Sequence, residues 1–307
     1  MSLALLFPGQ GSQHVGMGRE LARELPDARA VFQEADDVLG FALSELMWEG
    51  PEDALTETRN AQPAILVHSV AVHRAVADRL GDVAFAAGHS LGEFSAYVAA
   101  GALSFRDALD AVRLRGELMF SAGEERPGTM AAILGLDDAA VEEVCAGVEA
   151  GLCVPANFNS AGQVVVSGDR VGVARAMERA ENAGAKRVVA LKVSGAFHSP
   201  LMEPAETGLE AKLREIPFSD PAFPVVANVT ASPVTDGEEA RRLLLHQLTS
   251  PVRWAASVRT MLEGGARRFA ELGPGRVLCG LNRRNAPRGM PCDSLGTPAD
   301  LAEFVHG

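Results

Sequence analysis

The sequence predicts a mixed α/β protein in which a small βαββαβ unit is inserted into a larger part with a mostly parallel sheet. Residues 83–98, VAFAAGHSLGEFSAYV, read as a buried strand, a sharp turn and a helix. The elements expected between residues 129 and 193 follow the order βαββαβ, which is typical of a ferredoxin-like unit. We therefore expect a large subdomain, residues 1–126 and 195–307, and a small ferredoxin-like subdomain, residues 127–194.

Composition is that of a globular protein without a nucleic-acid or membrane partner. The chain has 307 residues, of which 47% are hydrophobic, enough for a sizeable core. No apolar run approaches the length of a bilayer span, and the first residues, MSLALLF, lack the basic lead of a signal peptide. A formal net charge of −12 argues against a general nucleic-acid binder, which needs a basic face.

The four cysteines, Cys145, Cys153, Cys279 and Cys292, show no C-x-x-C spacing and no histidine at metal-ligand spacing. We expect no structural metal, and a reducing cytoplasm fits this cysteine usage best.

The N-terminal strand, residues 3–7, ends in the turn PGQGSQ. A dinucleotide fingerprint would need a third glycine where the chain has His14, and no G-K-[ST] follows, so a phosphate loop is disfavoured. The turn is better placed to bring the amide of Gln10 beside the 83–98 turn. Helical periodicity follows over residues 22–47, and a longer helix is expected over residues 64–80, introduced by Asn60-Ala61-Gln62-Pro63.

Ser90 stands at the apex of the 83–98 turn. Gly88 and Gly92 complete the G-x-S-x-G pattern of a nucleophile elbow, in which glycines let strand and helix approach closely around a strained turn. The amide of Leu91, at the start of the following helix, can donate to a developing oxyanion. An ordinary strand-to-helix turn is the alternative interpretation.

Ser104 and Asp107 resemble a capping box that opens a helix over residues 105–120. Its apolar face leaves Arg106 and Arg113 pointing away, whereas Arg115 lies at the edge of that face. Arg115 either interacts at a site or covers apolar surface with its stem.

The remaining elements are expected in two groups. The small subdomain has strands at 129–134, 152–158, 163–167 and 187–193, and helices at 138–150 and 171–183. The C-terminal part has strands at 224–228 and 267–271, helices at 241–248, 254–263 and 277–281, and a loop-like tail from residue 287.

A serine needs a base to take its proton, so a histidine must lie within hydrogen-bond reach. Of the seven histidines, His198 is the best candidate, because it lies in a loop where the two subdomains meet. His89 is adjacent to Ser90 in sequence, so its side chain should diverge. No Asp or Glu between Ser90 and His198 stands out as the acid of a hydrolase triad.

The chain resembles the malonyl-CoA:acyl carrier protein transacylases of fatty acid synthesis and the related acyltransferase domains of polyketide synthases. The matching motifs extend along nearly the whole length: FPGQGSQ, NAQP, GHSLGE, RLRG, GTMAAILG, NFNSAGQVVVSG, GAFHSPLM, QLTSPVRW and GPGRVLCGL. The resemblance implies a hydrolase-like core with an inserted ferredoxin-like subdomain and a site in the cleft between them.

The resemblance also implies a role for each residue that matches a motif. Ser90 would be the acylated nucleophile and His198 its base, oriented by the main-chain carbonyl of Gln247 in place of a triad acid. Gln10 and Leu91 would supply the oxyanion amides.

Four further residues would form the substrate pocket. Arg115 would clamp the malonyl carboxylate, and Phe197 would crowd an α-methyl group. His89 and Asn157 would either shape the pocket or satisfy buried neighbours.

The implied activity is ping-pong transfer of a malonyl group from malonyl-CoA to holo acyl carrier protein by a cytoplasmic, monomeric enzyme that needs no metal or other cofactor. Three alternatives stay open: a trans-acting acyltransferase for a polyketide carrier, a serine hydrolase, and a non-catalytic carrier-binding module.

Overall fold

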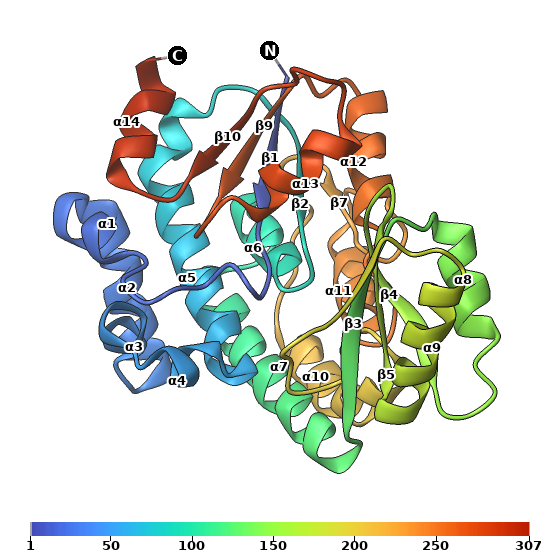
Figure 1. Ribbon diagram of the computed structural model, residues 1–307. Helices are drawn as coiled ribbons and strands as arrows, with labels where there is room; N and C mark the ends of the chain where they lie inside the picture. Colours follow the sequence, from blue (N-terminus) through green and yellow to red (C-terminus); the bar gives the residue numbers. More distant parts are fainter. Residues whose placement is uncertain (1, 307) are drawn as a thin grey trace.

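The computed structural model describes residues 2–306 and contains two sheets (Figure 1). Every neighbouring pair in the larger sheet is parallel except the last, β7 with β8. This confirms the predicted mostly parallel core. The six strands, in spatial order, are β10 (Cys292–Leu295), β9 (Arg268–Leu272), β1 (Leu3–Phe7), β2 (Val83–Gly88), β7 (Val225–Val226) and β8 (Pro233–Val234).

Strand β1 is buried along its whole length and sends alternate side chains to opposite faces of the sheet. Leu3, Leu5 and Phe7 join the main core. Ala4 and Leu6 pack into a second cluster on the other face. Helices of the main core include α5 (Thr58–Val76), α6 (Gly92–Ala99) and α7 (Phe105–Glu125), and the second cluster contains residues of α12 (Trp254–Glu263) and α13 (Val277–Asn285).

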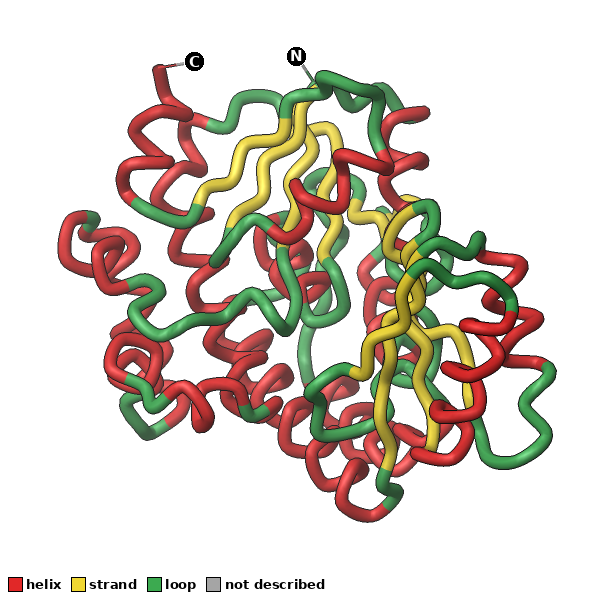
Figure 2. The backbone as a smooth tube through the Cα atoms, viewed as in Figure 1, coloured by secondary structure: helices red, strands yellow, loops and turns green. Residues whose placement is uncertain are grey.

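The smaller sheet is antiparallel throughout and confirms the ferredoxin-like prediction. Helices α8 (Asp138–Ala146) and α9 (Arg170–Asn182) pack against it and enclose a separate core (Figures 1 and 2). A bridge between Asn157 and Val252 ties it to the larger part. Its strands, in spatial order, are β4 (Cys153–Ser160), β5 (Gln163–Asp169), β3 (Gly128–Leu134) and β6 (Arg187–Ala190).

Helix α5 begins at Thr58, six residues before the predicted start, so Pro63 lies inside it. Proline has no N–H to donate to the carbonyl of Arg59 four residues earlier. The side chain of Arg113 donates to that carbonyl instead, at 2.8 Å. A contact from a distant helix therefore allows the proline inside, which local sequence cannot show.

The other helices follow the predicted order with different limits. The periodic stretch 22–47 divides into the last residues of α1 (Arg19–Glu24), then α2 (Pro26–Leu39) and α3 (Leu43–Glu49). Leu25 is extended, and Gly40 takes a left-handed conformation with φ 72°. Helix α10 (Glu203–Glu215) has no counterpart in the sequence prediction. The remaining helices are α4 (Glu52–Thr56) and α11 (Gly237–His246), with 3₁₀ turns at Ala77–Arg79 and Pro200–Met202.

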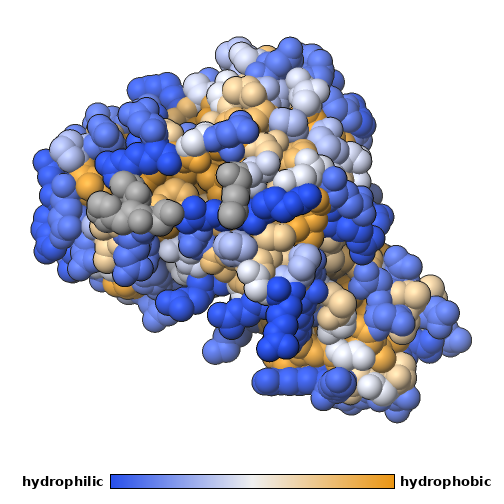
Figure 3. Space-filling model, turned by 90° about the horizontal axis from the view of Figure 1, so that it is seen from above, coloured by the Kyte–Doolittle hydropathy of each residue, from blue (hydrophilic) through white to orange (hydrophobic). Residues whose placement is uncertain are grey.

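The loop-like tail predicted from residue 287 is wrong. Strand β10 extends the sheet at its edge, and α14 (Pro298–His306) follows. The segment CDSL has no apolar alternation, so pairing with β9 is what makes it a strand. Seen from above, the surface at this end of the molecule mixes hydrophilic residues with apolar ones (Figure 3).

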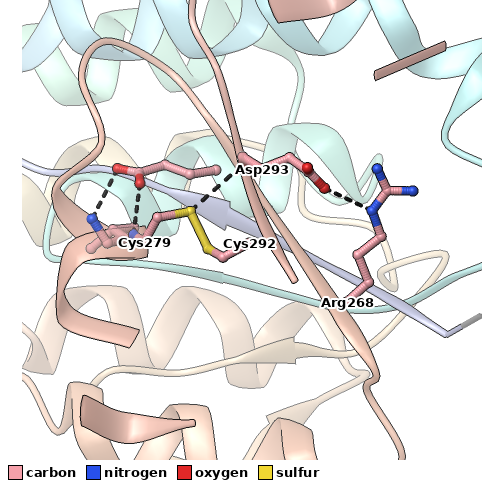
Figure 4. The surroundings of a disulfide bond; sticks show 6 residues. Arg268, Cys279, Cys292 and Asp293 are labelled. Atoms are coloured by element: carbon pink, nitrogen blue, oxygen red, sulfur yellow. Dashed lines mark hydrogen bonds and ion pairs between the residues drawn. A yellow bond between two sulfur atoms is a disulfide. The ribbon is translucent and has the colours of Figure 1, made fainter. Parts of the chain in front are cut away.

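A disulfide bond joins Cys279 of α13 to Cys292 of β10 (Figure 4). The sequence analysis did not predict this bond, since it took the four cysteines as unpaired in a reducing environment. The buried carboxylate of Glu271 holds the same helix end by accepting from the amides of Leu278 and Cys279, at 3.0 and 2.8 Å. Two independent interactions therefore fix the start of α13.

No helix within residues 2–306 combines the length and the apolar character that crossing a membrane requires.

Candidate active site

Ser90 lies where β2 turns into α6, with φ 51°. This left-handed backbone conformation costs a non-glycine residue about 1–3 kcal/mol and is concentrated at functional sites. The flanking glycines are required by space, since a Cβ on Gly88 would lie 1.9 Å from the backbone of Gly92. A Cβ on Gly92 would lie 2.1 Å from the carbonyl oxygen of Phe7. The turn therefore has the geometry of a nucleophile elbow.

His198 meets Ser90 from a segment 108 residues further along the chain, with 2.8 Å between Nε2 and Oγ. Its Nδ1 lies 2.9 Å from the carbonyl oxygen of Gln247 and 3.1 Å from that of Ser250. Because carbonyl oxygens only accept, Nδ1 carries the proton and Nε2 accepts from the serine hydroxyl. His198 also has a left-handed backbone, with φ 58°.

Burial keeps this imidazole neutral. His198 is 4% exposed, and desolvation, with a smaller effect from the cation of Arg115, lowers its pKa to about 3. The carbonyls of Gln247 and Ser250 act in the opposite direction. A neutral imidazole is the form that can take a proton from Ser90.

Arg115 is buried in the same place, although the sequence put it only at the edge of a helix face. Its Nη1 donates to Oε1 of Gln62, and its Nη2 donates to Oε1 of Gln247 at 2.9 Å and to Oγ of Ser90 at 3.2 Å. Its Nε donates to no protein group within residues 2–306. Burial lowers the pKa of Arg115 to about 10, and the carboxylate of Glu93 opposes that shift. The side chain is thus a cation at neutral pH whose hydrogen-bond partners are all uncharged.

These groups line a cavity of about 390 Å³. Its apolar wall includes Met119, Met130 and Leu191. Gln247 lies behind the cavity and reaches it through its contacts with His198 and Arg115. Eight of the nine predicted site residues line the cavity: Gln10, His89, Ser90, Leu91, Arg115, Asn157, Phe197 and His198.

Gln10 and Leu91, whose main-chain amides are expected to face the oxyanion, both line the cavity. Leu91 precedes α6, and the loop after β1 is held against the elbow by the amide of His89, which donates to the carbonyl of Phe7 at 2.9 Å. The side chain of Gln10 donates to Thr58 Oγ1 at 3.1 Å and so anchors this loop. Within residues 2–306, the main-chain amides of Gln10 and Leu91 donate to no protein acceptor.

His89 and Asn157 form the side of the cavity nearest the small sheet. The ring of His89 diverges from Ser90, lies 5.7 Å from the ring of Trp254 between centroids, and contacts Oδ1 of Asn159 through Nε2 at 2.8 Å. Burial lowers its pKa. His89 is therefore a neutral wall residue with its own partner.

The sequence analysis did not predict a role for three residues that support the site. Gln62 lies in the motif NAQP and Glu93 in the motif GHSLGE, and both are buried. A polar residue within an otherwise buried stretch was the signal that could have identified them. Asn228, at the end of a predicted strand, accepts from the amide of Ser90 at 2.7 Å and donates to the carbonyl of Gly88 at 2.6 Å. It therefore braces the strained turn from a distant part of the chain.

Within residues 2–306 no group of three or more His, Cys, Asp or Glu side chains is arranged to hold a metal ion.

Comparison with known proteins gives one consistent result. The family model described as "Acyl transferase domain" matches residues 4–293. The malonyl CoA-acyl carrier protein transacylase of Bacillus subtilis (strain 168) is 47% identical over 284 residues, which cover 92% of this chain and 90% of that protein.

Solved structures agree over the full length. An acyl-carrier-protein-S-malonyltransferase from Bartonella henselae superimposes with a TM-score of 0.95 at 43% identity, covering 100% of this chain and 99% of that one. A malonyl-transacylase in complex with a type II PKS acyl-carrier protein gives the same TM-score, 0.95, at 41% identity and the same coverage, 100% and 99%.

Proposed function

Because the chain belongs to the acyl transferase domain family, we propose that it is an acyl-carrier-protein S-malonyltransferase of fatty acid biosynthesis. It moves a malonyl group from malonyl-CoA to the phosphopantetheine thiol of holo acyl carrier protein. The observation that carries this proposal is the position of Arg115, whose Nη2 lies 3.2 Å from the Oγ of a serine that is paired with a neutral histidine.

Acylation begins when Ser90 Oγ attacks the thioester carbonyl of malonyl-CoA and His198 Nε2 takes the hydroxyl proton. The amides of Gln10 and Leu91 stabilise the negative charge that develops on the carbonyl oxygen, where loss of one donor typically costs about 10²–10³-fold in rate. The C–S bond breaks, His198 returns the proton to the thiolate, and CoA leaves.

Transfer reverses these roles. The phosphopantetheine thiol gives its proton to His198 and attacks the malonyl-Ser90 ester, and the serine oxygen takes the proton as the ester breaks. The Gln247 carbonyl holds the imidazole ring in one orientation throughout. Since thioester and oxyester exchange without oxidation or reduction, these steps need no cofactor beyond the CoA thioester substrate.

Selection for malonyl rests on Arg115 and Phe197. The Nε and Nη2 atoms form one edge of the guanidinium, which matches the two oxygens of a carboxylate. Phe197, which is buried and lines the cavity, would crowd an α-methyl group, and one methyl group is worth about 1–3 kcal/mol. Asn157 and His89 complete the wall. A free carboxylate is thus a stronger requirement than the absence of a methyl group.

The proposal is tested by detecting the covalent malonyl-enzyme. Wild-type protein incubated with malonyl-CoA should gain one malonyl group by intact mass, and holo acyl carrier protein should remove it. Ser90→Ala should gain none. A wild-type protein that stays unmodified would refute the assignment.

The second candidate is a trans-acting acyltransferase that loads a polyketide synthase carrier. The malonyl-transacylase solved with a type II PKS carrier matches this chain over its full length, which keeps this candidate open. Rates of malonyl transfer to a fatty acid carrier and to a polyketide carrier, measured side by side, separate the two. A serine hydrolase would instead lose the acyl group to water at a rate independent of carrier.

We further propose that the enzyme acts as a cytoplasmic monomer, with residues 127–194 as a distinct small subdomain. The four strands of the small sheet support this division, because all of them lie between Gly128 and Ala190. Reduction of the Cys279–Cys292 bond in that compartment would leave α13 held by Glu271.

A further inference from the structure

Glu93 is a carboxylic acid buried directly beneath the active site. It is the second residue of α6, three positions after Ser90, and its side chain is 0% exposed. It does not line the cavity. Removing a carboxylate from water is costly unless hydrogen bonds compensate. The role of Glu93 can therefore be inferred from the residues that donate hydrogen bonds to it.

One oxygen of Glu93 accepts from two segments that are remote in sequence. Its Oε2 lies 2.7 Å from Nε2 of Gln247 and 3.1 Å from the backbone amide of Asn228. The other oxygen, Oε1, has no hydrogen-bond partner within residues 2–306.

These two partners lead separately to the two reacting side chains. The main-chain carbonyl of Gln247 accepts from His198 Nδ1 at 2.9 Å. The side chain of Asn228 holds the amide of Ser90 at 2.7 Å. The Gln247 side chain also donates to the carbonyl of Ser90 at 3.0 Å. Glu93 thus accepts hydrogen bonds from both the residue that orients His198 and the residue that holds Ser90.

Glu93 also fixes which way the Gln247 amide points. A carboxylate oxygen accepts, so the NH₂ group of Gln247 must face it. Oε1 of Gln247 then faces Arg115 and accepts from Nη2 at 2.9 Å. If the amide turned over, its NH₂ would face a guanidinium that has only donors.

We propose that Glu93 is a positioning residue of the malonyl transfer reaction, which holds Gln247 and Asn228 so that His198 and Ser90 keep their reactive geometry. This inference rests on the proposed function. The glutamate touches no reacting atom, so it acts on the rate of acylation more than on the binding of malonyl-CoA.

The experiment compares two substitutions of similar volume. Glu93→Leu removes both accepted hydrogen bonds, whereas Glu93→Gln keeps an acceptor oxygen toward Gln247 and Asn228 and places its NH₂ where Oε1 has no partner. Single-turnover formation of malonyl-Ser90 is followed by rapid quench and intact mass over a range of malonyl-CoA concentrations. The readouts are the maximal acylation rate and the half-saturating concentration.

For Glu93→Leu we expect a maximal rate lower by about a hundred-fold, the order of loss that a misplacement of about 1 Å causes. The half-saturating concentration should stay within about threefold, because Glu93 lies outside the cavity. Glu93→Gln should recover a rate within about threefold of wild type, because the acceptor is retained. Thermal unfolding is measured in parallel.

Two results overturn the inference: a wild-type rate in Glu93→Leu, or a half-saturating concentration raised in both variants at an unchanged maximal rate. If Glu93→Leu does not fold, Glu93→Asp replaces it, since it keeps the charge but withdraws the acceptor by one methylene. A wild-type rate in Glu93→Asp likewise overturns the inference. Failure of the wild-type protein to acquire malonyl would instead reject the proposed function.

Discussion

Replacing Arg115 by alanine should change which acyl group the enzyme accepts. In the free protein its Nε donates to no protein group within residues 2–306, and its contact with Ser90 Oγ is long, at 3.2 Å. A malonyl carboxylate on the Nε–Nη2 edge therefore replaces little existing hydrogen bonding. Two charge-assisted hydrogen bonds contribute about 3–6 kcal/mol together.

At about 1.4 kcal/mol per factor of ten, the lower figure corresponds to a loss of about a hundred-fold in kcat/KM for malonyl-CoA. Acetyl-CoA, which has no carboxylate, should lose much less. The assay is initial acylation of Ser90 by each thioester, and the quantity of interest is the ratio of the two values. Damage to the elbow or the base affects both substrates alike and cancels in that ratio. Equal losses for malonyl and acetyl groups in Arg115→Ala would show that the arginine does not read the carboxylate.

Three further predictions concern stability and the elbow. Buried neutral histidines bind fewer protons when folded, so below pH 6.5 each destabilises the fold by up to about 1.4 kcal/mol per pH unit. They are His68, His73 and His198, whose pKa values fall to about 3, 4 and 3 through burial, and His89, whose pKa burial also lowers. Burial raises the pKa of Glu93 to about 7 and raises that of Glu271 as well, so these two carboxyl groups oppose the histidines. Because four histidines outweigh two carboxyl groups, the midpoint urea concentration of unfolding should be lower at pH 5 than at pH 7, and equal midpoints would contradict this. The Cys279–Cys292 bond closes a loop of sequence separation 13, so its reduction should lower the free energy of unfolding by about 3 kcal/mol and Tm by a few degrees. Acylation of Ser90 should persist. Scanning calorimetry with and without dithiothreitol measures the change in Tm. Gly88→Ala should abolish malonyl-Ser90 formation in the mass assay, because its Cβ would meet Gly92 backbone at 1.9 Å; Gly280→Ala, with open space around it, should remain active.

Local pattern was sufficient for the parts of the fold that depend on neighbours in sequence. The βαββαβ order, the Ser104 cap and the elbow follow from periodicity, capping residues and glycine spacing, and the structure places them as expected. Helix α5 and strand β10 depend on partners far along the chain, Arg113 and β9, and were misjudged for that reason.

The candidate site divides in the same way. The sequence identified Ser90 at the apex of a predicted turn and Arg115 at the edge of an apolar helix face. It could not place either of them beside Gln247, which lies 157 residues from Ser90 and 132 from Arg115. The roles of Phe197 and Gln247 came from resemblance to a family, whereas the turn after the first strand had already pointed to the amide of Gln10. Glu93 was visible only as a polar residue inside a buried motif and Asn228 only as the end of a predicted strand, because their function lies in contacts that exist only after folding.

The choice of a neutral carbonyl to orient His198 has a physical reason in this site. A carboxylate side chain in place of Gln247 would put a fixed anion next to Arg115, because Nη2 lies 2.9 Å from Oε1 of the Gln247 side chain. That anion would pair with the guanidinium and compete with the malonyl carboxylate. The Gln247 amide instead separates the carboxylate of Glu93 from Arg115, donating to one and accepting from the other. Arg115 therefore keeps its charge, and its Nε–Nη2 edge stays free of a protein anion until a substrate carboxylate arrives.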